Sequence, residues 1–194
     1  MTIPLTLPYL TLAGAESARD EGNLTRTLIA AANGDSGALA RLYDAVAGEL
    51  YGLALWRCRN HGLAEDAIQD VFCRLASGNV RLPASLSSPR AWLFASVRNA
   101  VIDLERRAAR WSVLEDSAVE LAHSKQRSEV SREEVIALSA ALAELSPKMR
   151  EAVYLHVYVG MTFREAGAVL GVPTFTAASR YRLALRRLEK SLGA

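Results

Sequence analysis

The chain has 194 residues, of which 51% are hydrophobic and 23% are charged, and its formal net charge is +2 at neutral pH. These proportions are typical of a globular protein, and the length accommodates two compact domains of modest size with a linker. Ala, Leu, Arg and Glu dominate, while aromatic residues make up only 7%. Because long β-branched runs are also absent, we expect an all-α fold.

The first 22 residues predict a poorly ordered leader. The apolar start ends in Ala-Gly-Ala at residue 15, which imitates a signal-peptide cleavage site, but it has no basic region and contains Pro4 and Pro8. The segment therefore does not have the pattern of a signal peptide. No apolar run in the sequence is long enough to span a membrane. We expect a cytoplasmic protein that does not insert into membranes.

Residues that carry chemistry are few and scattered. Cys58 and Cys73 form neither a Cys-x-x-Cys motif nor a Cys/His cluster, which predicts two small buried apolar residues and no metal site. His61, His123 and His156 have no partner at the spacing of a nucleophile–base pair or a metal site. We expect no catalytic residue, no metal and no cofactor, and the sequence argues against an enzyme.

A first helical domain is expected over residues 23–110. Apolar residues recur at helical spacing from Asn23 to Leu55, with a break at Gly34-Asp35-Ser36 that offers Asp35 or Ser36 as an N-cap. Two further helices are predicted, one from His61-Gly62 to about Ser77 and one from Ser88-Pro89 to the basic pair Arg106-Arg107.

A flexible acidic linker over residues 111–130 and a second helical domain over residues 131–194 follow. Between Trp111 and Val135, six acidic residues stand against three basic ones. From Ser146 to the end, eight basic residues stand against three acidic ones. Helices are predicted to begin at a capping box at Ser131, at Ser146-Pro147 and at a capping box at Thr162, and the last one, after the turn at 171–174, runs to about Leu192.

The segment from Thr162 to Leu188 has the organisation of a helix-turn-helix, with a capped short helix, a turn that contains glycine and a longer basic helix. The inward face of the last helix is predicted to hold Ala177, Tyr181, Ala184, Leu185, Leu188 and Leu192. The outward face is predicted to hold Thr176, Ser179, Arg180, Arg182 and Arg186. A solvated amphipathic helix is the alternative, but five basic residues within eleven favour DNA binding in the major groove.

Three stretches together resemble sigma factors of the extracytoplasmic-function (ECF) type. Residues 64–75, Ala-Glu-Asp-Ala-Ile-Gln-Asp-Val-Phe-Cys-Arg-Leu, are similar to the polymerase-binding helix of that family. Residues 88–107 look like its promoter-melting region, and residues 142–180 resemble the domain that reads the upstream promoter element. The resemblance covers most of the chain beyond residue 24. It implies RNA polymerase core, promoter DNA and an anti-sigma factor as partners.

The resemblance also implies roles for individual residues. The polymerase core would bind Asp66, Gln69, Asp70, Phe72 and Arg74, although Phe72 fits a core position equally well. The −10 element would contact Arg98, Asn99, Arg106 and Arg107, with Trp92 in the core and Asp103 ordering its neighbours. The −35 element would contact Thr162, Arg164, Phe175, Thr176, Ser179, Arg180, Arg182 and Arg186.

The sequence departs from the family pattern at two positions of the last helix. The family commonly has glycine where this chain has Phe175, and a basic or polar residue where it has Ala178, so the resemblance does not fix the promoter sequence. One alternative is another class of helix-turn-helix regulator, such as a two-component output domain, which would need strands that the N-terminal half does not show. The other is a sigma-like decoy that occupies an anti-sigma factor without starting transcription.

Overall fold

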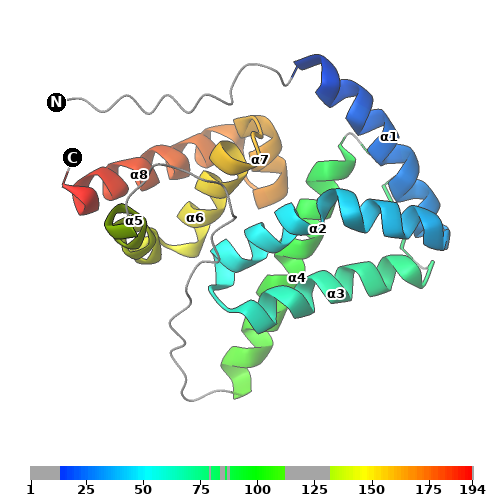
Figure 1. Cartoon of the computed structure of the whole chain (residues 1–194), viewed down its shortest axis with the longest axis horizontal. Coiled ribbons are helices and arrows are strands. Elements are labelled where there is room, and N and C mark those ends of the chain that lie inside the picture. Colours follow the sequence, from blue (N-terminus) through cyan, green and yellow to red (C-terminus); the bar gives the residue numbers. More distant parts are fainter. Residues whose placement is uncertain (1–13, 79, 84–85, 87, 112–131, 194) are drawn as a thin grey trace.

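The computed structural model describes residues 14–78, 80–83, 86, 88–111 and 132–193 (Figure 1). Within these ranges every regular element is a helix, which confirms the all-α prediction. The N-terminal half contains α1 (Gly14–Ala32), α2 (Ser36–Cys58), α3 (His61–Ala76) and α4 (Pro89–Trp111). The C-terminal half contains α5 (Arg132–Glu144), α6 (Pro147–Val153), the π-helical turn η1 (Tyr154–Tyr158), α7 (Phe163–Leu170) and α8 (Thr174–Leu192).

Local side-chain caps set several of the helix starts. The carboxylate of Asp35 accepts a hydrogen bond from the backbone N–H of Ala38, which confirms one of the two predicted caps of α2. Asn60 caps α3 by accepting from the N–H of Leu63, so this helix begins at His61 itself. The first helix begins at Gly14, so residues 14–22 are helical and not a leader. Residues 1–13, the linker from 112 on and the cap at Ser131 lie outside the described residues.

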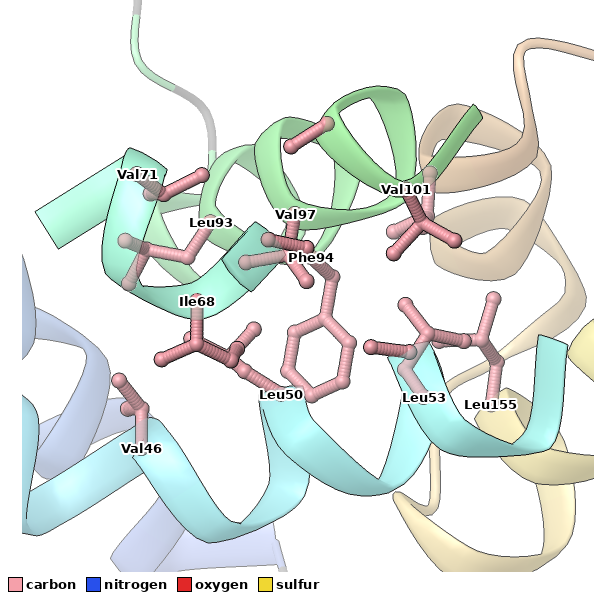
Figure 2. Packing of buried hydrophobic residues seen from close by; sticks show 14 of the residues in the cluster. Val46, Leu50, Leu53, Ile68, Val71, Leu93, Phe94, Val97, Val101 and Leu155 are labelled. Carbon is pink, nitrogen blue, oxygen red and sulfur yellow. The ribbon is translucent and has the colours of Figure 1, made fainter. Parts of the chain in front are cut away.

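The main core is built from α2, α3 and α4. Figure 2 shows Phe94 of α4 among Leu50 and Leu53 of α2, with Ile68 and Val71 of α3 completing the layer. All of these side chains are buried. Their spacing by three or four residues along each helix explains why the three helices pack side by side, since such positions share one face.

The C-terminal half joins this core and also has a smaller core of its own. Leu155 of η1 is fully buried and points toward Leu53 of α2 in Figure 2. Ala166, Val169 and Leu170 of α7 belong to the same cluster. The smaller core holds Ala141, Leu142, Leu145, Met149, Val153, Ala184 and Leu188. The two helical halves are therefore packed directly against each other.

None of the described helices is long and apolar enough to cross a membrane. Among the same residues, no group of three or more His, Cys, Asp or Glu side chains could hold a metal ion. The prediction for the cysteines is wrong in part, because Cys58 is half-buried while Cys73 is exposed on α3. Position 73 follows the buried Phe72 and so points away from the core.

Candidate functional site

The helix-turn-helix is held by a tight turn between α7 and α8. Thr162 and Glu165 form the predicted capping box, with both reciprocal hydrogen bonds present. Gly171 ends α7 in the left-handed conformation with φ of 65°, which favours glycine. A Cβ atom at Gly167 would lie 2.8 Å from the carbonyl oxygen of Val172. Glycine at these positions allows α7 and the turn to approach closely, and this fixes where α8 begins.

One face of α8 is exposed along its length. Phe175, Ser179, Arg182 and Arg186 are exposed and are spaced by four, three and four residues, so they share a face. The buried residues Ala177, Ala184 and Leu188 lie on the opposite face. We refer to the first four residues as the outer face of α8.

Several residues predicted to belong to the −35 site lie outside the outer face of α8. Thr176 and Arg180 are half-buried on the flank of α8, and one guanidinium nitrogen of Arg180, Nη1, is buried without a hydrogen-bond partner. Thr162 is exposed, but its hydroxyl group is bonded to Glu165 within the capping box. Arg164 is exposed at the start of α7. Leu192, predicted to face inward, is 44% exposed because α8 extends beyond the smaller core.

The outer face of α8 is basic. From residue 166 to residue 188 the sequence contains four arginines and no acidic residue. Arg182 and Arg186 form no ion pair with any residue that the structure describes. Unneutralised guanidinium groups on one side of a helix attract phosphate groups.

The candidate −10 residues on α4 fall into two groups. Asn99, Arg106 and Arg107 are exposed. Asp103 lies 3.6 Å from Arg106 as an i,i+3 ion pair, in agreement with the expected ordering role. Arg98, in contrast, has a side chain that is only 13% exposed, because it is bonded to Glu151 of α6. Trp92 is half-buried and packs against the core.

A buried carboxylate links the two halves of the protein. Glu151 is fully buried and its Oε1 atom accepts from Nη1 of Arg57 at 2.6 Å and from Nε of Arg98 at 2.9 Å. Arg57 also reaches Glu105 of α4 at 2.7 Å. Burial alone would lower the pKa of Arg57, but Glu151 and then Glu105 reverse this, so the pKa is raised. The network therefore ties α2, α4 and α6 together through charge.

Arg150 attaches α6 to the end of α2. Its guanidinium donates to the carbonyl oxygens of Trp56 at 2.6 Å and Arg57 at 2.8 Å, in the last turn of α2. Such carbonyls have no partner within their own helix and favour a cation. Burial, followed by the charge of Arg59, lowers the pKa of Arg150.

Tyr154 of η1 fits against a glycine of α2. Its hydroxyl donates to the carbonyl oxygen of Glu49 at 2.8 Å. A Cβ atom on Gly52 would lie only 2.0 Å from that hydroxyl oxygen. Burial, with Tyr158 and Glu49 nearby, raises the pKa of Tyr154. We refer to the contact of α6 and η1 with α2 and α4 as the closed packing.

A groove of about 930 Å³ runs between α2 and α3. Tyr43, Glu65, Gln69, Phe72 and Cys73 are among the residues that line it. The ring of Phe72 is mostly buried and meets Tyr43 edge to face at 5.0 Å. The remaining candidates of the polymerase-binding set, Asp66, Asp70 and Arg74, are exposed on α3, and Asp70 pairs with Arg74 at 2.9 Å.

Apart from Arg98, the residues of the closed packing were not assigned a role by the sequence. Arg57 and Glu151 are separated by 94 residues, so no local periodicity connects them. The one usable signal is that Arg150-Glu151 stands between Met149 and Ala152-Val153, in a stretch of the short helix that is otherwise apolar. Charged residues at buried helical positions are rare unless they are paired.

Comparison with known proteins places both halves in one family. Sigma-70 region 2 matches residues 42–111, and sigma-70 region 4 matches residues 136–188. The ECF RNA polymerase sigma factor SigL of Mycobacterium tuberculosis is 30% identical over 165 residues, which cover 84% of this chain and 93% of SigL. The ECF RNA polymerase sigma factor SigK of a Mycobacterium species is 26% identical over 201 residues, covering 100% of this chain and 97% of the relative.

Two solved structures have the same fold. One is CnrH in complex with the cytosolic domain of CnrY, with a TM-score of 0.60, 26% identity and coverage of 88% of this chain and 97% of that chain. The other is the sigma factor RpoE in complex with the anti-sigma factor NepR from Bartonella quintana, with a TM-score of 0.62, 25% identity and coverage of 80% and 96%.

Proposed function

This chain belongs to the ECF RNA polymerase sigma factors. From that premise we propose which of its surfaces binds each promoter element and which binds the polymerase core. A sigma factor is a non-enzymatic subunit that binds the RNA polymerase core and directs transcription initiation at promoters. We assign the −35 element to the outer face of α8, the −10 element to α4, and the polymerase core to α3 with the adjoining groove.

The outer face of α8 is the observation that carries this proposal. Ser179, Arg182 and Arg186 are exposed on one side of a helix whose other side is buried. A recognition helix reads base edges with residues near its N-terminus, while arginines further along contact phosphates. Ser179 is placed for the first role, and Arg182 and Arg186 for the second.

The groove between α2 and α3 suits a helical segment of the polymerase. Phe72 and Tyr43 line the groove, and the exposed acidic residues Asp44 and Glu65 line it beside them, together with Gln69. Asp66, Asp70 and Arg74 are exposed on α3 outside this lining. A buried aromatic centre within a charged rim is typical of specific protein interfaces.

The closed packing does not allow one molecule to hold both promoter elements. Elements at −10 and −35 are about 25 base pairs apart, or roughly 85 Å of DNA. Arg98 is bonded to Glu151 on α6, which shares a core with α8 through Val153 and Ala184. The two reading surfaces are therefore about two helix diameters apart, roughly 20–25 Å.

We propose that the closed packing opens when the protein engages a promoter. Opening separates Glu151 from Arg98 and Arg57 and leaves these cations free to face DNA, as the assignment of Arg98 to the −10 element requires. The 20 residues from 112 to 131 connect the two halves. A chain of that length can extend over roughly 70 Å. Together with the roughly 20–25 Å that the helices on either side already span, this reaches the roughly 85 Å between the two elements.

We place this function in the cytoplasm, where RNA polymerase acts. We also propose that an anti-sigma factor restrains the protein. Support comes from the RpoE structure, a sigma factor of 25% identity that is bound to the anti-sigma factor NepR. The exposed surfaces of α3 and α8 are the regions that such a partner would have to cover to prevent initiation.

The experiment is in vitro transcription with RNA polymerase core on a library of genomic fragments, followed by mapping of start sites. The expected result is a set of transcripts that share a −10 and a −35 pattern and are lost with Arg106→Ala plus Arg107→Ala. The matched control is Arg26→Ala plus Arg41→Ala, which removes two exposed charges from α1 and α2. Core binding without transcripts would favour the decoy alternative, and absence of core binding would contradict the proposal.

A further inference from the structure

Phe175 is 72% exposed, more than any other large hydrophobic residue in the described chain. It is the second residue of α8 and the first residue of the outer face, in the N-terminal turn of the helix. The rings of His156, Phe163 and Tyr181 contact one another, but none of the ring contacts found among the described residues includes Phe175. The ring is thus presented to solvent without a packing role in this structure.

The backbone beneath Phe175 is held firmly. Pro173 fixes the start of the helix, and its carbonyl oxygen accepts from the N–H groups of Thr176 at 2.9 Å and Ala177 at 3.2 Å. The close approach at Gly167 and the left-handed Gly171 restrain the turn that precedes it. A phenyl ring has only two side-chain torsions, so little conformational entropy is lost when it binds.

The surroundings of the ring indicate a polyanionic partner that also has an apolar group where it meets Phe175. Phe175 shares its face with Ser179, Arg182 and Arg186, and no acidic residue occurs between residues 166 and 188. In the major groove of DNA, the thymine C5-methyl group is the apolar feature among hydrogen-bonding groups, and Phe is one of the side chains that contact it. Phosphates on either side would pair with the arginines.

We propose that Phe175 reads a thymine in the upstream promoter element through the C5-methyl group of the base. This inference rests on the proposed function, because it requires the outer face of α8 to enter the major groove. Phe175 is then a specificity-determining residue, and Ser179 one turn further along α8 faces the neighbouring base pair.

The test uses holoenzyme assembled from polymerase core and the full chain. A promoter is first selected by the wild-type holoenzyme from a library with a randomised −35 region, and each thymine of the selected element is then replaced singly by deoxyuridine, which removes only the methyl group. At one position we expect binding to weaken about fourfold, as the loss of one buried methyl group predicts. Phe175→Ala should bind the thymine and deoxyuridine versions of that position equally.

Adding a methyl group to the base at the same position of the DNA tests the contact in the opposite direction. At the same position, 5-methylcytosine should bind the wild-type holoenzyme more tightly than cytosine, and this difference should vanish with Phe175→Ala. Leu192→Ala is the matched control, because Leu192 is 44% exposed at the opposite end of α8. It should keep the full sensitivity to the methyl group.

The inference would be overturned if Phe175→Ala retained the deoxyuridine effect, or if no position of the wild-type complex responded to removal of the methyl group. A loss of affinity in Phe175→Ala that is equal for all bases would also overturn it, and would indicate a wedge between base steps or a protein contact. If the wild-type holoenzyme selected no promoter at all, the proposed function itself would fail. The outcomes are therefore distinguishable.

Discussion

Glu151 of α6 and Arg98 of α4 form an ion pair of 2.9 Å between the two halves of the protein. Arg98, one of the four residues assigned to the −10 element, is thus bonded to a carboxylate that has no exposure to solvent. The second oxygen of Glu151, Oε2, is buried without a hydrogen-bond partner. An incompletely satisfied buried carboxylate stabilises a contact less than a fully bonded one, which fits a contact that has to open.

The first prediction concerns Glu151→Gln, which keeps the shape of the side chain and removes its charge. Arg57 and Arg98 would then remain close together without their carboxylate. Breaking a buried ion pair from one side typically costs about 3 kcal/mol, so we expect a decrease of this order in the free energy of unfolding. Urea denaturation followed by circular dichroism measures it.

The same variant separates a structural role from a role in masking Arg98. Small-angle scattering should show a larger radius of gyration for Glu151→Gln, and transcription should persist, whereas Arg98→Ala should reduce transcription. The control is Glu189→Gln, an exposed acid near the end of α8 that should change neither quantity. Equal loss of transcription in Glu151→Gln and Arg98→Ala would contradict the masking role.

The second prediction concerns Gly52→Ala. The added Cβ would lie 2.0 Å from the hydroxyl oxygen of Tyr154, so the ring must move and lose its bond to Glu49. Overpacking of this kind costs about 1–3 kcal/mol. Gly48→Ala, one turn earlier in α2, meets nothing within 4 Å and should instead stabilise the helix by up to about 1 kcal/mol. Thermal melts that shift in the same direction for both variants would contradict the prediction.

The third prediction is a loss of stability at alkaline pH. Burial raises the pKa of Tyr154 above its ordinary value of 10.0. Above about pH 10 this tyrosine ionises in the unfolded chain while it stays protonated in the folded one, so the stabilising contribution present below that pH is lost as pH rises. The difference in unfolding free energy between wild type and Tyr154→Phe should be constant from about pH 7 to 9 and should change above about pH 10. A constant difference up to about pH 11 would argue against it.

Features encoded by neighbouring residues were predictable from the sequence. The cap at Asp35, the capping box of Thr162 with Glu165 and the left-handed Gly171 all act within a few residues of their own position. The helices and the helix-turn-helix followed from these signals and from apolar periodicity. The structure confirms these predictions of caps and helix ends.

Contacts between distant segments were not predictable in the same way. Arg98 looks like any other arginine of a basic helix, and only the tertiary structure places it against Glu151, 53 residues away. The flank positions Thr176 and Arg180 were predicted to be exposed, but they are half-buried because α8 packs over more than half of its circumference. A single sequence does not show which other helix packs against the flank of α8.

The fourth prediction uses Cys73, which lines the groove between α2 and α3. It is exposed, whereas Cys58 is half-buried and burial raises its pKa, which makes its thiolate scarcer. A maleimide should therefore modify Cys73 first, as mass spectrometry of the digested protein would show. The bulky adduct should prevent binding to polymerase core. Cys73→Ser should be insensitive to the reagent, and core binding by the fully modified wild type would exclude this groove as the docking site.

The last prediction addresses the phosphate contacts assigned to Arg182 and Arg186. Each arginine that neutralises a phosphate contributes about 0.9 to the slope of log affinity against log salt concentration. The variant with both arginines replaced by alanine should bind promoter DNA more weakly, with a slope smaller by roughly 2 and an unchanged preference for the −35 sequence. Arg187→Ala, an exposed cation about 120° away from Phe175 around the helix, should leave the slope within about 0.3 of wild type. An unchanged slope in the double variant, or an equal change in Arg187→Ala, would mean that α8 does not present its outer face to the DNA.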